Sequence, residues 1–183
     1  MPYFGVLKVG AEPISDDSSP QTIISNGRHA DTLAALLESS GISCKIVDGL
    51  KDTDKAAVQK LIWISIMWLL CHDCEGDPIT CAKVHKEKSV VVDQLLKELV
   101  PAANNLLEKY HPGGSEKGIG SIAEVGTHLQ DYSFSMPDAI PNKSLAIEEF
   151  EQRNGYLLSV EGSVPQTAHR KLVQSVVGYI PDY

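Results

Sequence analysis

Residues 89–110, SVVVDQLLKELVPAANNLLEKY, decide the fold, because they form the clearest amphipathic segment of this 183-residue chain. Apolar side chains recur there every three or four residues, which is the spacing of one face of an α-helix. This stripe consists of Val92, Leu95, Leu96, Leu99, Ala103, Leu106, Leu107 and Tyr110. His111-Pro112-Gly113-Gly114 follows the stripe and ends the segment. The pattern therefore predicts a long helix over residues 89–110 with one buried side.

Helical patterns continue on both sides of this segment. Asp54 is a suitable N-cap for an apolar helix that extends to about Cys71. The most apolar part of that helix, residues 61–71, is too short to span a bilayer and indicates a core helix. Further helices are expected within residues 119–129, from Ser144 to about Ser159, and after Pro165.

The first 53 residues follow a different pattern. Short runs of strand-forming residues occur at 3–9, 21–25 and 43–47. Residues 30–39 have leucines at helical spacing, and Gly41 ends that helix. Three short strands and one helix cannot cover both faces of a parallel sheet, so we expect the end of a larger α/β domain or cover from another chain. The predicted fold is mainly α with a small α/β N-terminal portion, divided into residues 1–53 and 54–183.

The composition is that of a globular protein. Hydrophobic residues make up 43% and charged residues 22%, which excludes a disordered chain. The formal charge of -8 argues against a nucleic-acid binder, because phosphate contacts require clustered Lys and Arg. Four cysteines in a chain of this size favour a reducing compartment, and no secretory signal is visible at the N-terminus. A cytoplasmic protein without a membrane partner is expected, and an organelle is not excluded.

Lys60 is the first candidate for chemistry. Its neighbours one helical turn away are Ala56, Ala57, Trp63 and Ile64, so a helical arrangement surrounds the amine with apolar side chains. Burial lowers the pKa of a lysine, which suits a general acid that works near neutral pH. The alternative is a lysine whose stem packs on the core while its charged end reaches solvent.

Residues 134–155, FSMPDAIPNKSLAIEEFEQRNG, form the second candidate region. Ser144 is placed to accept a hydrogen bond from the first turn of a helix. Glu148, Glu149 and Glu151 crowd the beginning of that helix, where its dipole tolerates negative charge. A solvated acidic face is the simplest interpretation of this region, and a functional role is the alternative.

Together these two regions resemble ketopantoate reductases. Residues 56–63, AAVQKLIW, are similar to the entry of that family's helical C-terminal domain, where the lysine is the catalytic acid. Glu98 falls where the family often has a glutamate. The family's serine-methionine, aspartate and Glu-Ile-Asp-x-x-Asn-Gly signature resembles Ser135-Met136, Asp138, Glu149-Phe150-Glu151 and Asn154-Gly155.

The resemblance implies both a fold and a reaction. The implied fold is a 6-phosphogluconate dehydrogenase C-terminal-like helical domain after a Rossmann remnant, assembled as a homodimer. Lys60 would protonate the alkoxide formed when hydride from NADPH reaches a 2-keto acid. Glu149 would hold the substrate hydroxyl or the cofactor ribose, Ser135 would bind the substrate carboxylate, and Asp138 would support them.

The sequence departs from this family at two places. The family's asparagines after the lysine are replaced by Ile64 and Trp68, and no Gly-rich strand-turn-helix precedes the matched part. Residues 118–123 read G-x-G-x-x-A, but they lie inside the helical half, which indicates a chance match. We therefore expect an incomplete NADPH site on this chain. The alternative function is a non-catalytic binding or oligomerisation module that has kept the reductase scaffold.

Cys71, Cys74, Cys81 and His85 form a C-x2-C-x6-C-x3-H pattern of ligands that suit Zn. The first two cysteines lie at the end of an apolar helix, and the spacing matches no zinc module that we can name. No metal site is therefore predicted, although zinc binding by these four residues is the alternative.

Overall fold

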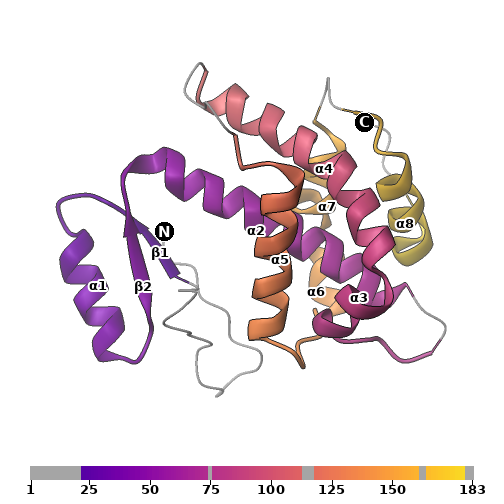
Figure 1. Cartoon of the computed structure of the whole chain (residues 1–183), viewed down its shortest axis with the longest axis horizontal. Helices are drawn as coiled ribbons and strands as arrows, with labels where there is room; N and C mark the ends of the chain where they lie inside the picture. The colour runs from indigo at the N-terminus through magenta and orange to yellow at the C-terminus, as the bar shows by residue number, and fades with distance from the viewer. Residues whose placement is uncertain (1–21, 74–75, 113–117, 161–163, 180–183) are drawn as a thin grey trace. The chain divides into compact units, whose positions relative to one another are not determined.

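A computed structural model of the chain describes residues 22–73, 76–112, 118–160 and 164–179 (Figure 1). The strand expected at residues 3–9 lies outside these ranges. The chain divides into two compact units, an N-terminal unit, Met1–Ala57, and a helical unit, Val58–Tyr183. The division falls inside helix α2, Gly49–His72.

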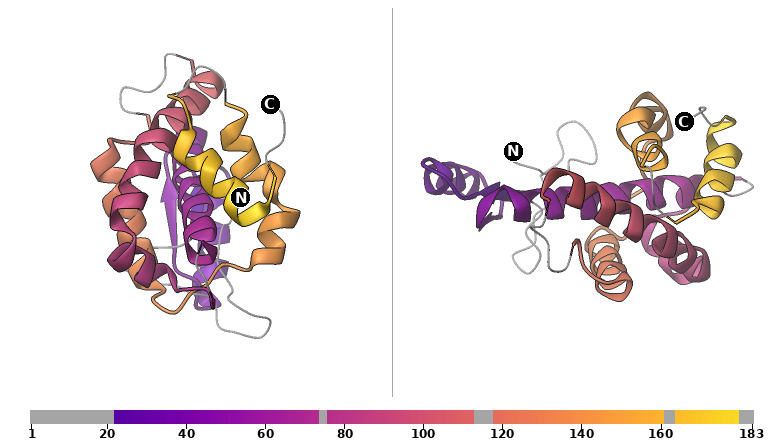
Figure 2. Two further views of the ribbon diagram at one scale, coloured as in Figure 1. Left: turned by 90° about the vertical axis from the view of Figure 1, so that its right-hand side faces the viewer. Right: turned by 90° about the horizontal axis from the view of Figure 1, so that it is seen from above.

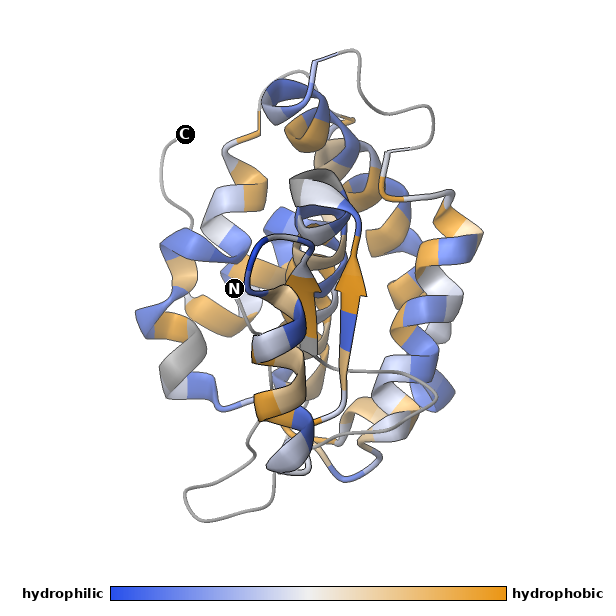
Figure 3. Ribbon diagram, turned by 90° about the vertical axis from the view of Figure 1, so that its left-hand side faces the viewer, coloured by the Kyte–Doolittle hydropathy of each residue, from blue (hydrophilic) through white to orange (hydrophobic). Residues whose placement is uncertain are grey.

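The described part of the N-terminal unit is a β-α-β element. Strand β1, Thr22–Ser25, pairs in parallel with strand β2, Cys44–Val47, and helix α1, Ala30–Ser39, connects them. Helix α1 lies along the two strands (Figure 3). The small core between them consists of Ile24, Ala30 and Ala34, with Leu33, Leu37, Cys44 and Ile46 packed against it. The predictions of these strands and of this helix are confirmed.

The helical unit is built around the apolar part of α2. Its six residues from Ile66 to Cys71 are completely buried, and Figure 2 shows the other helices of this unit arranged around them. These elements are α3 (Cys81–Glu87), α4 (Ser89–Tyr110), α5 (Ile122–Ser135), α6 (Lys143–Glu148), the 3-10 helix η1 (Phe150–Gln152), α7 (Asn154–Leu158) and α8 (Thr167–Val177). No helix among the described residues is long and apolar enough to cross a membrane. The coarse prediction, mainly α with a small α/β portion, is confirmed.

Helix α4 has the predicted bounds and continues through Pro101. Its stripe is buried against neighbouring helices, with one exception. Tyr110 is 61% exposed, because it occupies the last turn of α4, and its hydroxyl lies 2.9 Å from that of Tyr156. The prediction that Tyr110 belongs to the buried stripe is therefore wrong.

The expected N-cap of α2 at Asp54 is also wrong. The helix begins at Gly49, five residues earlier in the chain, and Asp54 lies inside it. Residues 50–53 are polar on average, but none of them is Gly or Pro. This stretch therefore contains no residue that breaks a helix, and α2 extends through it. The Thr53 hydroxyl donates to the carbonyl of Gly49 (3.2 Å) within this first turn.

The helix expected from Ser144 to Ser159 is divided into three short elements. Arg153 separates η1 from α7 because its backbone angles, φ -119° and ψ -102°, are not helical. Asn142, rather than Ser144, provides the capping oxygen at the start of α6, where its Oδ1 accepts from the Ser144 amide (3.0 Å). A propensity pattern predicted helix here, but it could not reveal where the backbone turns.

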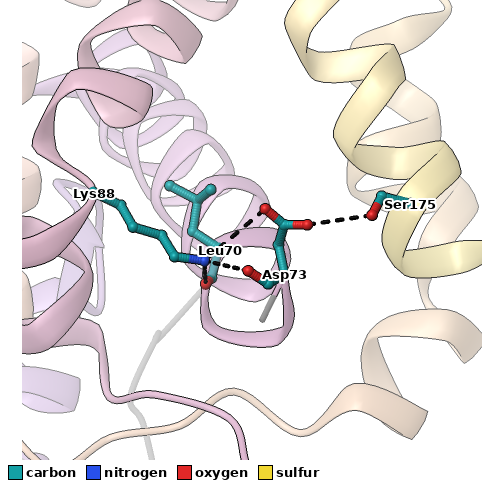
Figure 4. Close-up of polar contacts among 4 residues, drawn as sticks. All are labelled: Leu70, Asp73, Lys88 and Ser175. Carbon is teal, nitrogen blue, oxygen red and sulfur yellow. Dashed lines mark hydrogen bonds and ion pairs between the residues drawn. The ribbon is translucent and has the colours of Figure 1, made fainter. Parts of the chain in front are cut away.

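Lys88 closes the C-terminal end of α2 (Figure 4). Its ammonium donates to the carbonyls of Leu70 (3.0 Å) and Asp73, where a helix has unpaired carbonyls and a negative dipole end. The Asp73 carboxylate lies 3.9 Å from this ammonium and accepts from the Ser175 hydroxyl of α8 (3.2 Å). These contacts connect the ends of α2 and α8 and the beginning of α4.

Candidate functional site

Lys60 lies on α2 with its side chain half-buried. Its Nζ lies 5.6 Å from the centre of the Tyr132 ring of α5, a distance typical of a cation–π contact. The Tyr132 ring is itself held edge-on by Trp63, with 4.6 Å between the ring centres. Burial, followed by the positive charge of Arg153, lowers the pKa of Lys60 from 10.5 to about 8. The amine is thus protonated at neutral pH but releases its proton more readily than an ordinary lysine.

Arg153 is the second cation of this site. It forms an ion pair with Glu149, which precedes it by four residues and lies on the other side of η1. The side chain of Arg153 is 22% exposed and that of Glu149 is 41% exposed. Arg153 is therefore the more buried partner of the pair, and Glu149 is the partner that faces solvent.

The site formed by Lys60, Tyr132, Glu149 and Arg153 has a positive balance of charge. Arg153 pairs with Glu149 and its positive charge acts on Lys60, so these three side chains together carry one net positive charge when Lys60 is protonated. A guanidinium has a planar set of N–H donors that matches a carboxylate, and an adjacent ammonium can contact the same anion. This arrangement is suited to a small monoanion, and Lys60 can supply a proton to a group bound beside it.

Ser135 is the last residue of α5, and Asp138 follows three residues later. The Ser135 hydroxyl donates to the carbonyl of Tyr132 (2.8 Å) one turn earlier, so its proton is used within the helix. Asp138 is exposed. Of the four residues assigned by resemblance, Lys60 and Glu149 are thus connected through Arg153.

Asn154 of the Asn-Gly pair has a place in the core. It is completely buried, and its side chain meets Nε2 of His169 from α8 (2.8 Å). The other ring nitrogen, Nδ1, meets Oε1 of Gln166 (2.7 Å), whose own Nε2 donates to the carbonyl of Leu157 (2.6 Å). Burial, followed by the charge of Arg170, lowers the pKa of His169 to about 3. The imidazole is therefore neutral and can donate through one nitrogen only.

This neutral ring determines the orientation of the Asn154 amide. Because Gln166 offers an oxygen, His169 donates from Nδ1 and accepts at Nε2. The Asn154 atom that meets Nε2 must then be a donor, so its amide nitrogen faces the ring and its oxygen takes the opposite side. The amide nitrogen of Asn154 otherwise lacks a partner among the described atoms, which supports this assignment.

Ile64 and Trp68 follow Lys60 at the positions where the resembling family has asparagines. Trp68 is completely buried and packs with Phe150 and Leu158 in an apolar cluster. Ile64 is partly buried. Neither side chain can hydrogen-bond a substrate as an amide would, since Trp68 offers only a donor within the core.

The cysteine-histidine pattern is brought together only in part. Sγ of Cys71 lies 4.0 Å from Sγ of Cys81, and both side chains are completely buried. His85 instead turns its Nε2 to the hydroxyl of Ser133 (3.0 Å), and Cys74 lies outside the described residues. In the ranges that the structure describes, no three His, Cys, Asp or Glu side chains could hold a metal ion together.

The G-x-G-x-x-A stretch does not fit the pyrophosphate of NADPH. Such a site requires free amides at a helix N-terminus. The amide of Ile119 donates to Asn104 (2.8 Å), and that of Ser121 donates to the carboxylate of Glu124 (2.7 Å). Glu124 and Ser121 form a capping box at the start of α5, so negative charge already occupies the position of a phosphate.

Arg153 and Tyr132 are the site residues that the sequence alone did not indicate. Each contributes through a contact between elements that are far apart in the chain, so local periodicity carries no information about it. One signal was present, however, because Glu149 and Arg153 have the four-residue spacing of a helical ion pair.

Comparison with protein-family models finds no match, and comparison with curated protein sequences and with solved structures finds none either.

Proposed function

We propose that the helical unit binds a small 2-keto acid through its carboxylate, as the substrate-binding domain of a ketopantoate reductase-like oxidoreductase. In this proposal Lys60 and Arg153 contact the carboxylate, and Lys60 is placed to donate a proton to the keto oxygen. The helical unit would have a 6-phosphogluconate dehydrogenase C-terminal-like fold, the N-terminal unit would be a Rossmann remnant, and two copies would form a homodimer. Because the amides of the G-x-G-x-x-A stretch are already bonded within the chain, we assign no pyrophosphate to it and derive no hydride step.

The observation that supports this proposal most is the proximity of two cations in a partly buried position. Burial lowers the pKa of Lys60 most, and the positive charge of Arg153 lowers this pKa further, so the protonated amine is disfavoured at this position. A bound carboxylate would favour the protonated form of Lys60, because it places a negative charge beside this amine and the guanidinium of Arg153. An anion ligand would thus stabilise the two cations at this position.

The test is calorimetric titration of the full chain with pyruvate, the simplest 2-keto acid, at pH 7 and constant ionic strength. Lys60→Met and Arg153→Gln should each raise the Kd at least about tenfold, since a charged hydrogen bond contributes about 1.5–3 kcal/mol. Lys97→Met, which removes an exposed cation from α4, is the matched control and should leave the Kd unchanged. Pyruvamide, which has the keto group but no carboxylate, should not bind.

Two results would contradict the proposal. One is equal affinity for pyruvate and pyruvamide, which would show that no carboxylate is recognised. The other is an unchanged Kd in both the Lys60 and the Arg153 variants, which would place any bound pyruvate elsewhere on the chain.

A second candidate function, the non-catalytic binding or oligomerisation module, is favoured by Trp68. This residue places an indole in the apolar core at a position where the resembling enzymes have a polar amide. Sedimentation would show a stable dimer in either case, so the pyruvate titration distinguishes the two: a module of this kind would not bind pyruvate.

A further inference from the structure

The carboxylate of Glu149 forms an ion pair with the guanidinium of Arg153. Its carboxylate has the same chemistry as the ligand that we assign to this site. The two partners differ in exposure, 41% for Glu149 and 22% for Arg153, so the carboxylate is the one that can turn into solvent.

We propose that Glu149 is an internal competitor for the ligand carboxylate, and that a ligand entering the site displaces Glu149 from Arg153. This inference rests on the proposed function and adds a regulatory contact to it. It gives Glu149 a role opposite to that of a substrate-holding residue, and it makes Arg153 the residue for which the two carboxylates compete.

Exchange between the two carboxylates is physically reasonable. Both would use the same planar set of guanidinium donors, so Glu149 and a ligand exclude each other at Arg153. An ion pair as exposed as this one is weak, because water competes with it and two flexible side chains must be ordered. A ligand carboxylate beside both Arg153 and Lys60 meets two cations, while the released Glu149 regains its hydration.

The chain offers a matched pair of substitutions. Glu149→Gln removes the competing charge with almost no change of shape. Glu148→Gln removes the same charge from the preceding, exposed residue at the end of α6. At about 0.15 M salt the long-range effect of either change is screened, so the comparison isolates the direct contact with Arg153.

The experiment is titration of the wild-type chain and both variants with pyruvate, with Arg153→Gln alongside. Glu149→Gln should bind pyruvate about two- to fivefold more tightly than wild type, the range expected for loss of an exposed ion pair. Glu148→Gln should match the wild type. Binding by Glu149→Gln with no detectable binding by wild type would be the stronger form of the same result.

Two other outcomes would overturn the inference, and they differ in what they leave standing. An unchanged or weaker affinity of Glu149→Gln, with binding lost in Arg153→Gln, would reject the competitor and leave the carboxylate site intact. Absence of pyruvate binding in both wild type and Glu149→Gln would reject the inference together with the proposed function.

Discussion

At the scale of single residues, His169 couples the stability of the helical unit to pH. The folded pKa is about 3 and the ordinary value is 6.5, so between these values the unfolded chain binds more protons than the folded chain. The contribution of His169 is therefore complete above pH 6.5 and is lost as the pH falls towards 3. For one group the slope is at most about 1.4 kcal/mol per pH unit.

His169→Gln should reduce this dependence on pH. Urea unfolding from pH 7 to pH 4, followed by tryptophan fluorescence, measures it, because both tryptophans, Trp63 and Trp68, lie in the helical unit. In the variant, the slope of the free energy of unfolding against pH should fall by the contribution of about one proton. This change does not depend on the stability of the variant at pH 7. Equal slopes in wild type and His169→Gln would show that the ring is not buried in its neutral form.

The sequence predicted the surroundings of some residues and not of others. Lys60 could be identified because its apolar neighbours lie on the same helix, at spacings that the chain itself displays. Its partners Tyr132 and Arg153 could not be identified, because they approach from other elements. The roles of Asn154 and Glu98 were likewise hidden, since both bind α8 across the core.

At the scale of elements, α8 depends on a side chain from another helix. Its N-cap residue, Gln166, makes no capping hydrogen bond with its side chain. The carboxylate of Glu98 on α4 instead accepts hydrogen bonds from the backbone amides of Ala168 (2.9 Å) and His169 (3.0 Å). Glu98 is 9% exposed, so it is a buried cap that joins α4 to α8.

Glu98→Ala should lower the free energy of unfolding of the helical unit by about 1–3 kcal/mol, because two amides lose a charged acceptor. Glu98→Gln should lose less, since its amide oxygen can still accept one of these bonds. Gln94→Ala, on the exposed side of the same helix, is the control. A loss from Glu98→Ala no larger than that of the control would show that α8 is capped in another way.

Element bounds followed from the sequence where periodicity and a terminating residue agreed. Helix α1 ends as expected before Gly41, which has a positive φ of 75°, and α4 ends before His111. The start of α2 and the division of residues 144–159 were not predicted. In the first case a polar stretch continued the helix, and in the second the backbone of Arg153 left helical geometry without a Gly or Pro to indicate it.

At the scale of the whole molecule, only one of the two units contains the proposed carboxylate site. The overall balance of the described elements, mainly helical with a small α/β portion, followed from the sequence. The site lies wholly within the helical unit, since Lys60, Tyr132, Glu149 and Arg153 all come from Val58–Tyr183. Carboxylate binding at Lys60 and Arg153 can therefore be tested on the full chain without reference to the N-terminal unit.

The most direct test is the pKa of Lys60, measured by NMR titration of the lysine ε-carbon with and without saturating pyruvate. Assignment comes from the signal that disappears in Lys60→Met. We expect a pKa of about 8 for Lys60 in the free protein and a rise of about one unit or more with pyruvate, because a bound anion favours the protonated amine. A pKa near 10.5 in the free protein would contradict the half-buried position of Lys60 near the positive charge of Arg153. A pKa that pyruvate leaves unchanged would contradict the carboxylate site.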